Sequence, residues 1–474
     1  MGLQEFSDAA TRFDAAAQKV VEDRFLNGLA GVLNPDGMVN GQRGQLHPAL
    51  HFDPHGAAVG VVTETGAYRL CTSAPRIHSL EAVKDELLFS PRPYPDLVGR
   101  WADTDVAQFV GGGTVPSFSE VLTLAIKVLR DAMEFPRPEQ AVFVATWAVG
   151  TYFFPLFLTF PRLNLSGERE SGKSKLLTLL LGLAFNALLM VTPTPAVLFR
   201  LIHEFRATIL LDEVEGLDKE DAREILAIIN SGYKAGGTVA RCEGEKKKRV
   251  ESFNVYAPLA LAAIKTVNAT TEDRCIPLTL QRGSDRARIN AEIDLRAPIF
   301  GQIRSGCYGL LLIHWREVED AYRQVDFPDW LNGRARELWR PLFALGSLAD
   351  QENGLALTPD LLALAKEHVD SRTLVSAEGE ALLHVLVDRL GAAASVTVHP
   401  GDLTEALRTR LGWQHAPSPE LVASWLRRFR FPRGTPSRDR EGVRYEVTVE
   451  RLTDVQVRYG PPEPTHLHLH HSTR

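Results

Sequence analysis

The sequence predicts an α/β fold whose central domain is built on a parallel β-sheet. Three observations lead to this class. Apolar segments of strand and helix length alternate along the middle of the chain, as in a parallel sheet covered by helices. A glycine-rich loop, Gly167–Ser174, follows the first of these strands. A later apolar strand, Ala207–Leu211, ends in two carboxylates, and ligands bind at such strand ends.

Length and composition limit the possible classes of protein. A chain of 474 residues predicts two to four compact units, and 45% hydrophobic with 24% charged residues is typical of a globular protein. With a net charge of −6, any contact with nucleic acid has to come from local basic patches. Four scattered cysteines and an N-terminus without the pattern of a secretion signal favour a cytoplasmic protein.

Five regions are expected in chain order. Short alternating segments before Gly111 predict a small α+β domain, and a Ser/Glu capping box at Ser117 predicts the helix that leads into the core. Near the C-terminus, three helices followed by two β segments, Val443–Glu450 and Asp454–Tyr459, suggest a winged helix. The regions are an N-terminal α+β domain (1–116), a phosphate-loop core with a β-hairpin insertion (117–283), a helical lid (284–374), a winged-helix DNA-binding domain (375–460) and a disordered tail (461–474).

One uncharged apolar stretch, Ala141–Phe160, is about as long as a membrane span. Gly150 and Pro155 interrupt it, and within a few residues it runs into the phosphate loop, which has to lie in water. We therefore expect a buried helix followed by a strand, and no membrane partner. A membrane-spanning helix is the alternative.

The glycine-rich loop matches the pattern G-x-x-x-x-G-K-[ST] between a strand and an apolar helix. Glycines allow the loop amides and the following helix N-terminus to face phosphate, Lys173 adds positive charge, and Ser174 is expected on Mg²⁺. The expected cofactors are ATP and Mg²⁺. The nucleotide-binding residues are Gly167, Glu168, Arg169, Glu170, Ser171, Gly172, Lys173, Ser174 and Lys175.

The two carboxylates after the strand at 207–211 complete this prediction. Asp212 is expected to hold Mg²⁺ through water, and Glu213 to polarise the attacking water. A strand followed by two solvated acids is the simpler alternative.

The segments GERESGKS, ATILLDE, INSGYKAGGTVARCEG, FNVYAPLALAAI and TTEDRCIPLTL resemble the helicase-type AAA+ P-loop ATPases of phages, plasmids and integrative elements. More distantly, they resemble the superfamily 3 and minichromosome-maintenance helicases. The likeness covers roughly 118–459. It implies a homo-oligomeric ring, usually a hexamer, with ATP between neighbouring subunits and a hairpin that grips DNA in the central channel.

The resemblance also assigns arginines. Arg274 stands where the family places the arginine finger that reaches the neighbour's γ-phosphate, and a surface arginine paired with Asp273 or Glu272 is the alternative. Arg334 stands at the sensor position of the lid, with Arg336 as the competing choice. The first sensor residue is open among Lys265, Thr266 and Asn268.

Two basic segments are candidate DNA contacts. Between two β-like runs, Thr238–Cys242 and Val250–Tyr256, lies a turn with four consecutive cations, which an anionic partner would stabilise; a solvated loop tip is the alternative. Near the C-terminus, arginines cluster at the end of the segment 419–430, where they could contact DNA or simply complement the helix dipole of a protein-docking module. The DNA-binding candidates are Lys246, Lys247, Lys248, Arg249, Arg427, Arg428 and Arg430.

Histidines do not change this prediction. His47, His51 and His55 have the spacing of metal ligands on a helix, but neighbouring prolines forbid that helix, so a turn-rich loop is expected. No metal other than Mg²⁺ is assigned.

The sequence thus predicts an ATPase that couples hydrolysis to translocation on, or unwinding of, single-stranded or forked DNA, in the replication of a mobile element. An AAA+ protein remodeller and an ATP-dependent DNA-binding initiator or loader are the alternatives.

Overall fold

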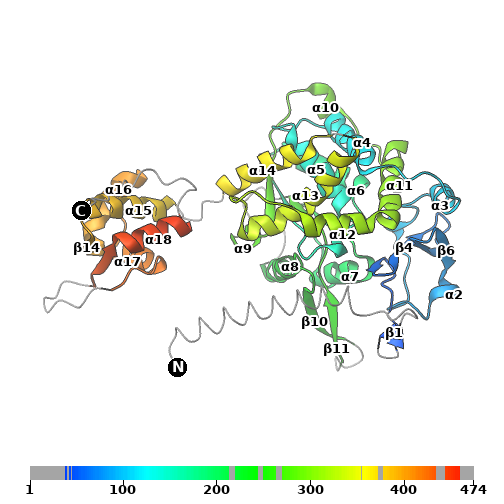
Figure 1. Ribbon diagram of the computed structural model, residues 1–474, viewed down its shortest axis with the longest axis horizontal. Helices are drawn as coiled ribbons and strands as arrows, with labels where there is room; N and C mark the ends of the chain where they lie inside the picture. The colour runs from blue at the N-terminus through cyan, green and yellow to red at the C-terminus, as the bar shows by residue number, and fades with distance from the viewer. Residues whose placement is uncertain are drawn as a thin grey trace, which may run out of the picture. The chain divides into compact units, whose positions relative to one another are not determined.

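The computed structural model describes residues 38–39, 42–43, 45–212, 219–243, 249–262, 269–353, 355–371, 377–433 and 443–459 (Figure 1). The chain divides into two compact units, Met1–Lys366 and Glu367–Arg474. The first unit contains an antiparallel and a parallel sheet, and the second is built from helices and one pair of strands.

The first unit opens with an antiparallel sheet in which neighbouring strands pair in chain order. Its strands are β3 (Leu50–Asp53), β4 (Gly56–Val62), β5 (Tyr68–Thr72) and β6 (Arg76–Ser79), preceded by the pair β1 (Met38–Val39) and β2 (Gln42–Arg43) and followed by α2 (Leu80–Val83) and α3 (Asp103–Val110). Ala58, Tyr68 and Leu70 on the inner face of the sheet pack against Val83 and Leu87. The predicted alternating segments therefore do form strands.

The centre of the first unit is a five-stranded parallel sheet in the order β13-β7-β12-β9-β8. Its strands are β7 (Arg162–Ser166), β8 (Ala187–Met190), β9 (Thr208–Leu211), β12 (Leu259–Ala262) and β13 (Cys275–Thr279). β9 and β12 are buried along their whole length, as expected for a parallel sheet covered on both faces. The predicted α/β core is confirmed.

The strand order creates a crevice at the carboxyl end of the sheet. From β7 the chain continues to β8 at one edge, whereas from the adjacent β12 it continues to β13 at the other edge. Such a reversal between neighbouring strands marks the place where open α/β sheets bind ligands. The glycine-rich loop follows β7 and therefore lies at this crevice.

Helices surround the parallel sheet. They are α4 (Phe118–Ala132), α5 (Glu139–Gly150), α6 (Lys173–Leu183), α7 (Pro195–Phe205), α8 (Lys219–Ser231) and α9 (Ala269–Glu272). The predicted capping box is present, because Ser117 Oγ accepts from the Glu120 amide while Glu120 Oε2 accepts from the Ser117 amide. The buried helix predicted in the apolar stretch is present and ends at Gly150, but the strand predicted after it is wrong, because Phe154–Leu156 forms a short 3-10 helix and β7 begins only at Arg162. Among the helices that the structure describes, none is long and apolar enough to cross a membrane.

The predicted hairpin is formed by β10 (Thr238–Glu243) and β11 (Arg249–Asn254), which pair antiparallel from Thr238 opposite Asn254 to Glu243 opposite Arg249. Figure 1 shows it extending away from α7 and α8. Its base is fixed to the core, since Phe253 and Val255 are buried in the hydrophobic cluster beside the parallel sheet.

The segment after the sheet is helical, as predicted. Its helices are α10 (Arg286–Asn290), α11 (Pro298–Ile313), α12 (Trp315–Gln324), α13 (Gly333–Asn353) and α14 (Leu357–Ser371). Trp339 and Leu342 of α13 are fully buried.

The second unit has its own hydrophobic core. Its elements are α15 (Ala377–Leu390), β14 (Ser395–Val398), α16 (Thr404–Leu411), α17 (Pro419–Arg428), β15 (Tyr445–Thr448) and α18 (Val449–Tyr459). β14 and β15 pair antiparallel, and Arg433 forms an isolated bridge with Tyr445.

One predicted element in the second unit is wrong. The second predicted β segment, Asp454–Tyr459, is the end of helix α18. Leu452 and Val455, three residues apart, are both buried in the core, which a helix allows and an alternating strand does not. The Thr448 hydroxyl also accepts from the Arg451 amide in the first turn.

Candidate functional site

The loop between β7 and α6 has a backbone that only glycine adopts readily. Gly167 has φ +147° and Gly172, the N-cap of α6, has φ +92°. A Cβ at Gly167 would lie 2.4 Å from the Leu280 carbonyl oxygen. The chain therefore turns tightly into the N-terminus of α6, where unpaired amides and the helix dipole favour an anion.

Lys173 places its charge over this loop. Its Nζ donates to the Gly167 carbonyl at 2.6 Å and to the Glu168 carbonyl at 3.0 Å, and lies 3.4 Å from Ser171 Oγ. The next residue, Ser174, is exposed in the first turn of α6. The loop, the helix N-terminus and the ammonium group thus form one electropositive site.

The other predicted loop residues divide by position. Glu168, Arg169 and Glu170 are exposed, and Glu170 forms a 2.9 Å ion pair with Arg282. Lys175 points elsewhere, because its Nζ donates to carbonyls at the end of α10, at 2.5 Å to Arg288 and 2.8 Å to Ala291. Burial lowers its pKa. In this geometry Lys175 ties α10 to α6 rather than facing the loop.

Asp212 lies at the carboxyl end of the parallel sheet, where the glycine-rich loop also lies. The registers place Leu261 of β12 between Asn164 of β7 and Leu211 of β9. Two strand spacings of about 4.8 Å therefore separate β9 from β7, so the Asp212 backbone is about 10 Å from that of Leu165. The Asp212 amide donates to the Met190 carbonyl at 2.9 Å, which fixes the residue at the end of β9.

The segment after β13 borders the loop on the other side. The Leu280 amide donates to the Ser166 carbonyl at 2.8 Å. Glu134, just after α4, accepts from the Asp285 amide at 3.1 Å and from Ser284, and these hydrogen bonds lower its pKa. No local sequence pattern indicates Glu134, because its partners are some 150 residues away.

The two predicted arginines, Arg274 and Arg334, meet on one side chain that the sequence did not single out. The guanidinium carbons lie 5.1 Å and 4.8 Å from the ring centroid of Tyr233, which is buried. Arg334 also donates to the Tyr233 hydroxyl and forms ion pairs with Asp273 at 3.5 Å and Glu337 at 3.3 Å. We call these five residues the Tyr233 cluster.

Further contacts fix Tyr233 and add charge. The Tyr233 carbonyl accepts from the Phe160 amide at 3.1 Å, and Gly232 is required because a Cβ there would lie 1.9 Å from the Val255 carbonyl. Lys234 pairs with Glu337 at 3.2 Å. With Lys234 beside the Tyr233 cluster, three cations and two carboxylates lie together, which leaves an excess of one positive charge.

This cluster and the phosphate loop lie at opposite ends of the sheet. Arg274 directly precedes β13, whose first residue, Cys275, is in register with Arg162 at the start of β7. The loop follows the last residue of β7, so the whole length of a five-residue strand, about 16 Å, separates the two sites. Arg274 is therefore remote from the phosphate loop of its own chain.

Several predicted residues lie outside the described part of the chain: Glu213, Lys246, Lys247, Lys248, Lys265, Thr266 and Asn268. Arg249 is the first residue of β11. In the second unit Arg427, Arg428 and Arg430 are exposed at and after the end of α17, and Arg427 donates to the Tyr445 hydroxyl at 3.4 Å.

The predicted histidine loop is only partly a loop, since His51 lies in β3. His47 is buried, its Nε2 lies 2.9 Å from the His203 carbonyl, and its Nδ1 accepts from the Ala49 amide. Burial, followed by nearby Arg206, lowers the pKa of His47 to about 2. Across the described ranges, no group of three or more His, Cys, Asp or Glu side chains is placed to hold a metal ion.

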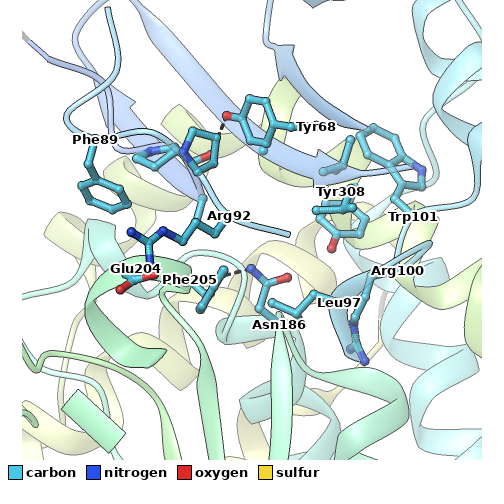
Figure 2. A pocket seen from close by; sticks show the side chains of 16 residues that line it. Tyr68, Phe89, Arg92, Leu97, Arg100, Trp101, Asn186, Glu204, Phe205 and Tyr308 are labelled. Carbon is cyan, nitrogen blue, oxygen red and sulfur yellow. Dashed lines mark hydrogen bonds between the residues drawn. The ribbon is translucent and has the colours of Figure 1, made fainter. Parts of the chain in front are cut away.

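A separate pocket lies between the antiparallel sheet and the parallel core (Figure 2). Tyr68 lines it from β5, Phe205 from the end of α7 and Tyr308 from α11, and Trp101 stacks on Tyr308 with centroids 4.8 Å apart. Asn186, another lining residue, directly precedes β8. The pocket is therefore at the amino end of the parallel sheet and distinct from the phosphate loop.

No known protein family and no curated protein matches the sequence. Among solved structures the chain is similar to two described as A form apo structures of the NrS-1 C terminal region. They share 8% and 9% sequence identity with it, at TM-scores of 0.35 and 0.33, over 82% of this chain and 96% of that chain. A likeness at this level shows no activity for this chain.

Proposed function

We propose that the chain is an ATP-driven DNA motor of the AAA+ type, working as a ring of identical subunits. The observation that carries the proposal is the carboxyl edge of the parallel sheet, where the phosphate loop, Lys173 and Asp212 lie at the crevice between β7 and β12.

The residues at this edge fit a nucleotide with its metal ion. Gly167 and Gly172 leave room for phosphate against the backbone, and Lys173 neutralises its charge. Ser174 and Asp212 offer the hydroxyl and carboxylate oxygens that Mg²⁺ prefers. When bound, Mg²⁺ would neutralise charge on the β- and γ-phosphates.

The position of the Tyr233 cluster supports a site shared between chains. Arg274 lies about one strand length from its own loop, so it can reach a γ-phosphate only on a neighbouring chain. Arg334 contacts the same tyrosine and would approach the same phosphate. A head-to-tail contact of this kind repeats from chain to chain and closes into a ring when the rotation allows.

The charge and position of the β10–β11 hairpin, and the element order of the second unit, support DNA as the polymer along which the motor moves. The β10–β11 hairpin extends from the first unit, and the sequence places Lys246–Lys248 between its strands (Figure 1). The helix–strand–helix–helix–strand order of the second unit and the Arg433–Tyr445 bridge also suit a winged helix.

Mixed assemblies test the shared site. Lys173→Ala should abolish ATP binding, and Arg274→Ala should bind ATP without hydrolysing it. Mixing the two proteins should restore part of the ATPase activity, because one supplies an intact loop and the other an intact arginine. Full turnover by Arg274→Ala alone would refute the shared site.

The proposal that the motor moves on DNA is tested by the effect of DNA on the rate of ATP hydrolysis. Forked DNA should raise the turnover of the unmodified protein, and the quadruple alanine variant of Lys246–Arg249 should lose this stimulation while keeping its basal rate. Indifference of the unmodified protein to DNA would favour a protein remodeller. DNA binding without stimulation would favour an initiator.

A further inference from the structure

The second unit exposes a pair of tryptophans beside its arginines. Trp413 follows α16, where its amide donates to the Arg408 carbonyl at 3.1 Å, and it remains 36% exposed. Its ring lies edge-to-face against Trp425 of α17, with centroids 6.4 Å apart and planes at 70°. The two rings thus form an aromatic surface that Trp413 presents to solvent.

The exposed face of α17 continues this surface. Leu421, Trp425 and Arg428 are spaced four and three residues apart and therefore share one face of the helix. Trp425 is half-buried and also packs against the core of the second unit, in which Val422 and Leu426 are fully buried. Leu421 is 41% exposed. An apolar surface of this kind is unsuited to duplex DNA, whose base edges are recognised mainly by polar side chains in the major groove.

The charge around the aromatic pair indicates the chemistry of its partner. Between Thr404 and Arg433 the sequence has six arginines (408, 410, 427, 428, 430 and 433) and two acidic residues, Glu405 and Glu420. Two of the arginines have acidic partners, Glu405 and Asp388. Arg428 and Arg430 are exposed. Aromatic side chains beside cations suit a polyanion whose bases are unpaired.

We propose that Trp413 and Trp425 stack on the bases of single-stranded nucleic acid, with Arg428 and Arg430 contacting its phosphates. The proposal deepens the DNA-binding part of the proposed function and is independent of ATP hydrolysis. The C-terminal unit would then hold a displaced or unpaired strand rather than read a duplex.

Binding of three labelled ligands to the full-length protein without ATP tests this inference. The ligands are an oligothymidylate, an abasic oligonucleotide of the same length, which keeps the phosphates but lacks bases, and a duplex. Trp413→Ala should weaken oligothymidylate binding about tenfold and leave the abasic ligand unchanged. Trp413→Tyr should restore most of the affinity, since it keeps an aromatic face.

The arginines should behave differently. The double variant Arg428→Ala with Arg430→Ala should weaken binding of both single-stranded ligands and lower the slope of log affinity against log salt by about 0.7 for each lost contact. Trp330→Ala, a tryptophan change in the first unit, is the matched control and should change neither ligand.

The possible failures are distinguishable. Unchanged oligothymidylate binding by Trp413→Ala, or an equal loss for the abasic ligand, would overturn the stacking proposal and leave the pair as a protein-docking surface. If the Lys246–Arg249 variant alone lost DNA binding, the motor would stand and the stacking site would fall. No DNA binding by the unmodified protein would overturn both.

Discussion

At the scale of single residues, Gly167 decides whether the phosphate loop forms. Alanine at this position meets a φ of +147° and a backbone oxygen 2.4 Å from its Cβ. Gly167→Ala should cost about 1–3 kcal/mol of folding free energy and lower ATP affinity at least tenfold. Thermal unfolding and calorimetric titration with ATP would measure the two effects.

Gly66→Ala is the matched control for this change. Gly66 also has a positive φ, of +83°, but a Cβ there would meet nothing within 4 Å, and the residue lies in the turn between β4 and β5. The Gly66→Ala variant should have a lower free energy of unfolding but an unchanged affinity for ATP. Equal ATP affinity in Gly167→Ala and Gly66→Ala would contradict the assigned role of the loop.

Tyr233 should control turnover without controlling ATP binding. Tyr233→Leu removes the ring that two guanidinium groups contact, an interaction of about 0.5–2 kcal/mol each, whereas Tyr233→Phe removes only the hydroxyl partner of Arg334. We expect kcat for ATP to fall severalfold in the leucine variant and less in the phenylalanine variant, with ATP affinity unchanged. Undiminished kcat in Tyr233→Leu would make the cluster purely structural.

At the scale of elements, the antiparallel sheet contacts the parallel core through His47, whose imidazole stays neutral. His47 contacts the His203 carbonyl at the end of α7, and its pKa of about 2 compares with 6.5 for an ordinary histidine. The unfolded chain therefore binds a proton below pH 6.5 that the folded chain excludes. Stability is full above pH 6.5 and falls as the pH drops towards 2, by about 2 kcal/mol at pH 5.

His47→Gln should remove that part of the pH dependence, because glutamine keeps a donor and an acceptor but does not titrate in this range. Denaturant unfolding at pH 7 and pH 5 would measure the difference. Burial also lowers the pKa of His203, which adds a dependence of the same sign. His55→Gln, at an exposed turn, serves as the control, and an unaltered pH dependence in His47→Gln would show that His47 is not the source.

Local signals predicted elements well where capping and periodicity agreed. The capping box at Ser117, the strand ending at Leu211 and the hairpin strands are as predicted. The segment Asp454–Tyr459 failed because apolar and polar residues alternate in it, which mimics a strand, while burial of Leu452 and Val455 selects a helix. The two-residue alternation of a strand and the three-to-four-residue spacing of a helix compete in this segment, and tertiary packing selects the helix.

Only those residues of the candidate site that are adjacent in the sequence could be predicted from it. The loop residues are adjacent in sequence, so their pattern indicates their chemistry. The contact between Tyr233 and Arg334 spans 101 residues and depends on how the start of α13 packs against the turn after α8, which a single sequence does not encode as a local pattern. The DNA contacts assigned to Lys246–Arg249 and to the arginines at and after the end of α17 stay predictions.

At the scale of the whole molecule, two separate cores predict two unfolding events. The second unit buries its own cluster, including Leu386, Leu426 and Val447. A chain ending at Ser371, which keeps α14 whole, should retain the ATP affinity of the full protein. Calorimetry should show one transition for this shorter chain and two for the full chain. Loss of cooperative unfolding on removal of 372–474 would show that the units depend on each other.

The opposite placement of the loop and the Tyr233 cluster makes each chain, under the proposed function, a bifunctional building block with two unlike ends. In an open head-to-tail row of subunits, the loop at one end has no neighbouring arginines. The fraction of ATP sites that cannot hydrolyse ATP is therefore the reciprocal of the number of subunits, and closure of the row into a ring reduces this fraction to zero. ATP turnover per chain should then rise with protein concentration and level off when the rows close. A chain with one disabled end would act as a chain stopper, and small amounts of it would suppress activity out of proportion to its share.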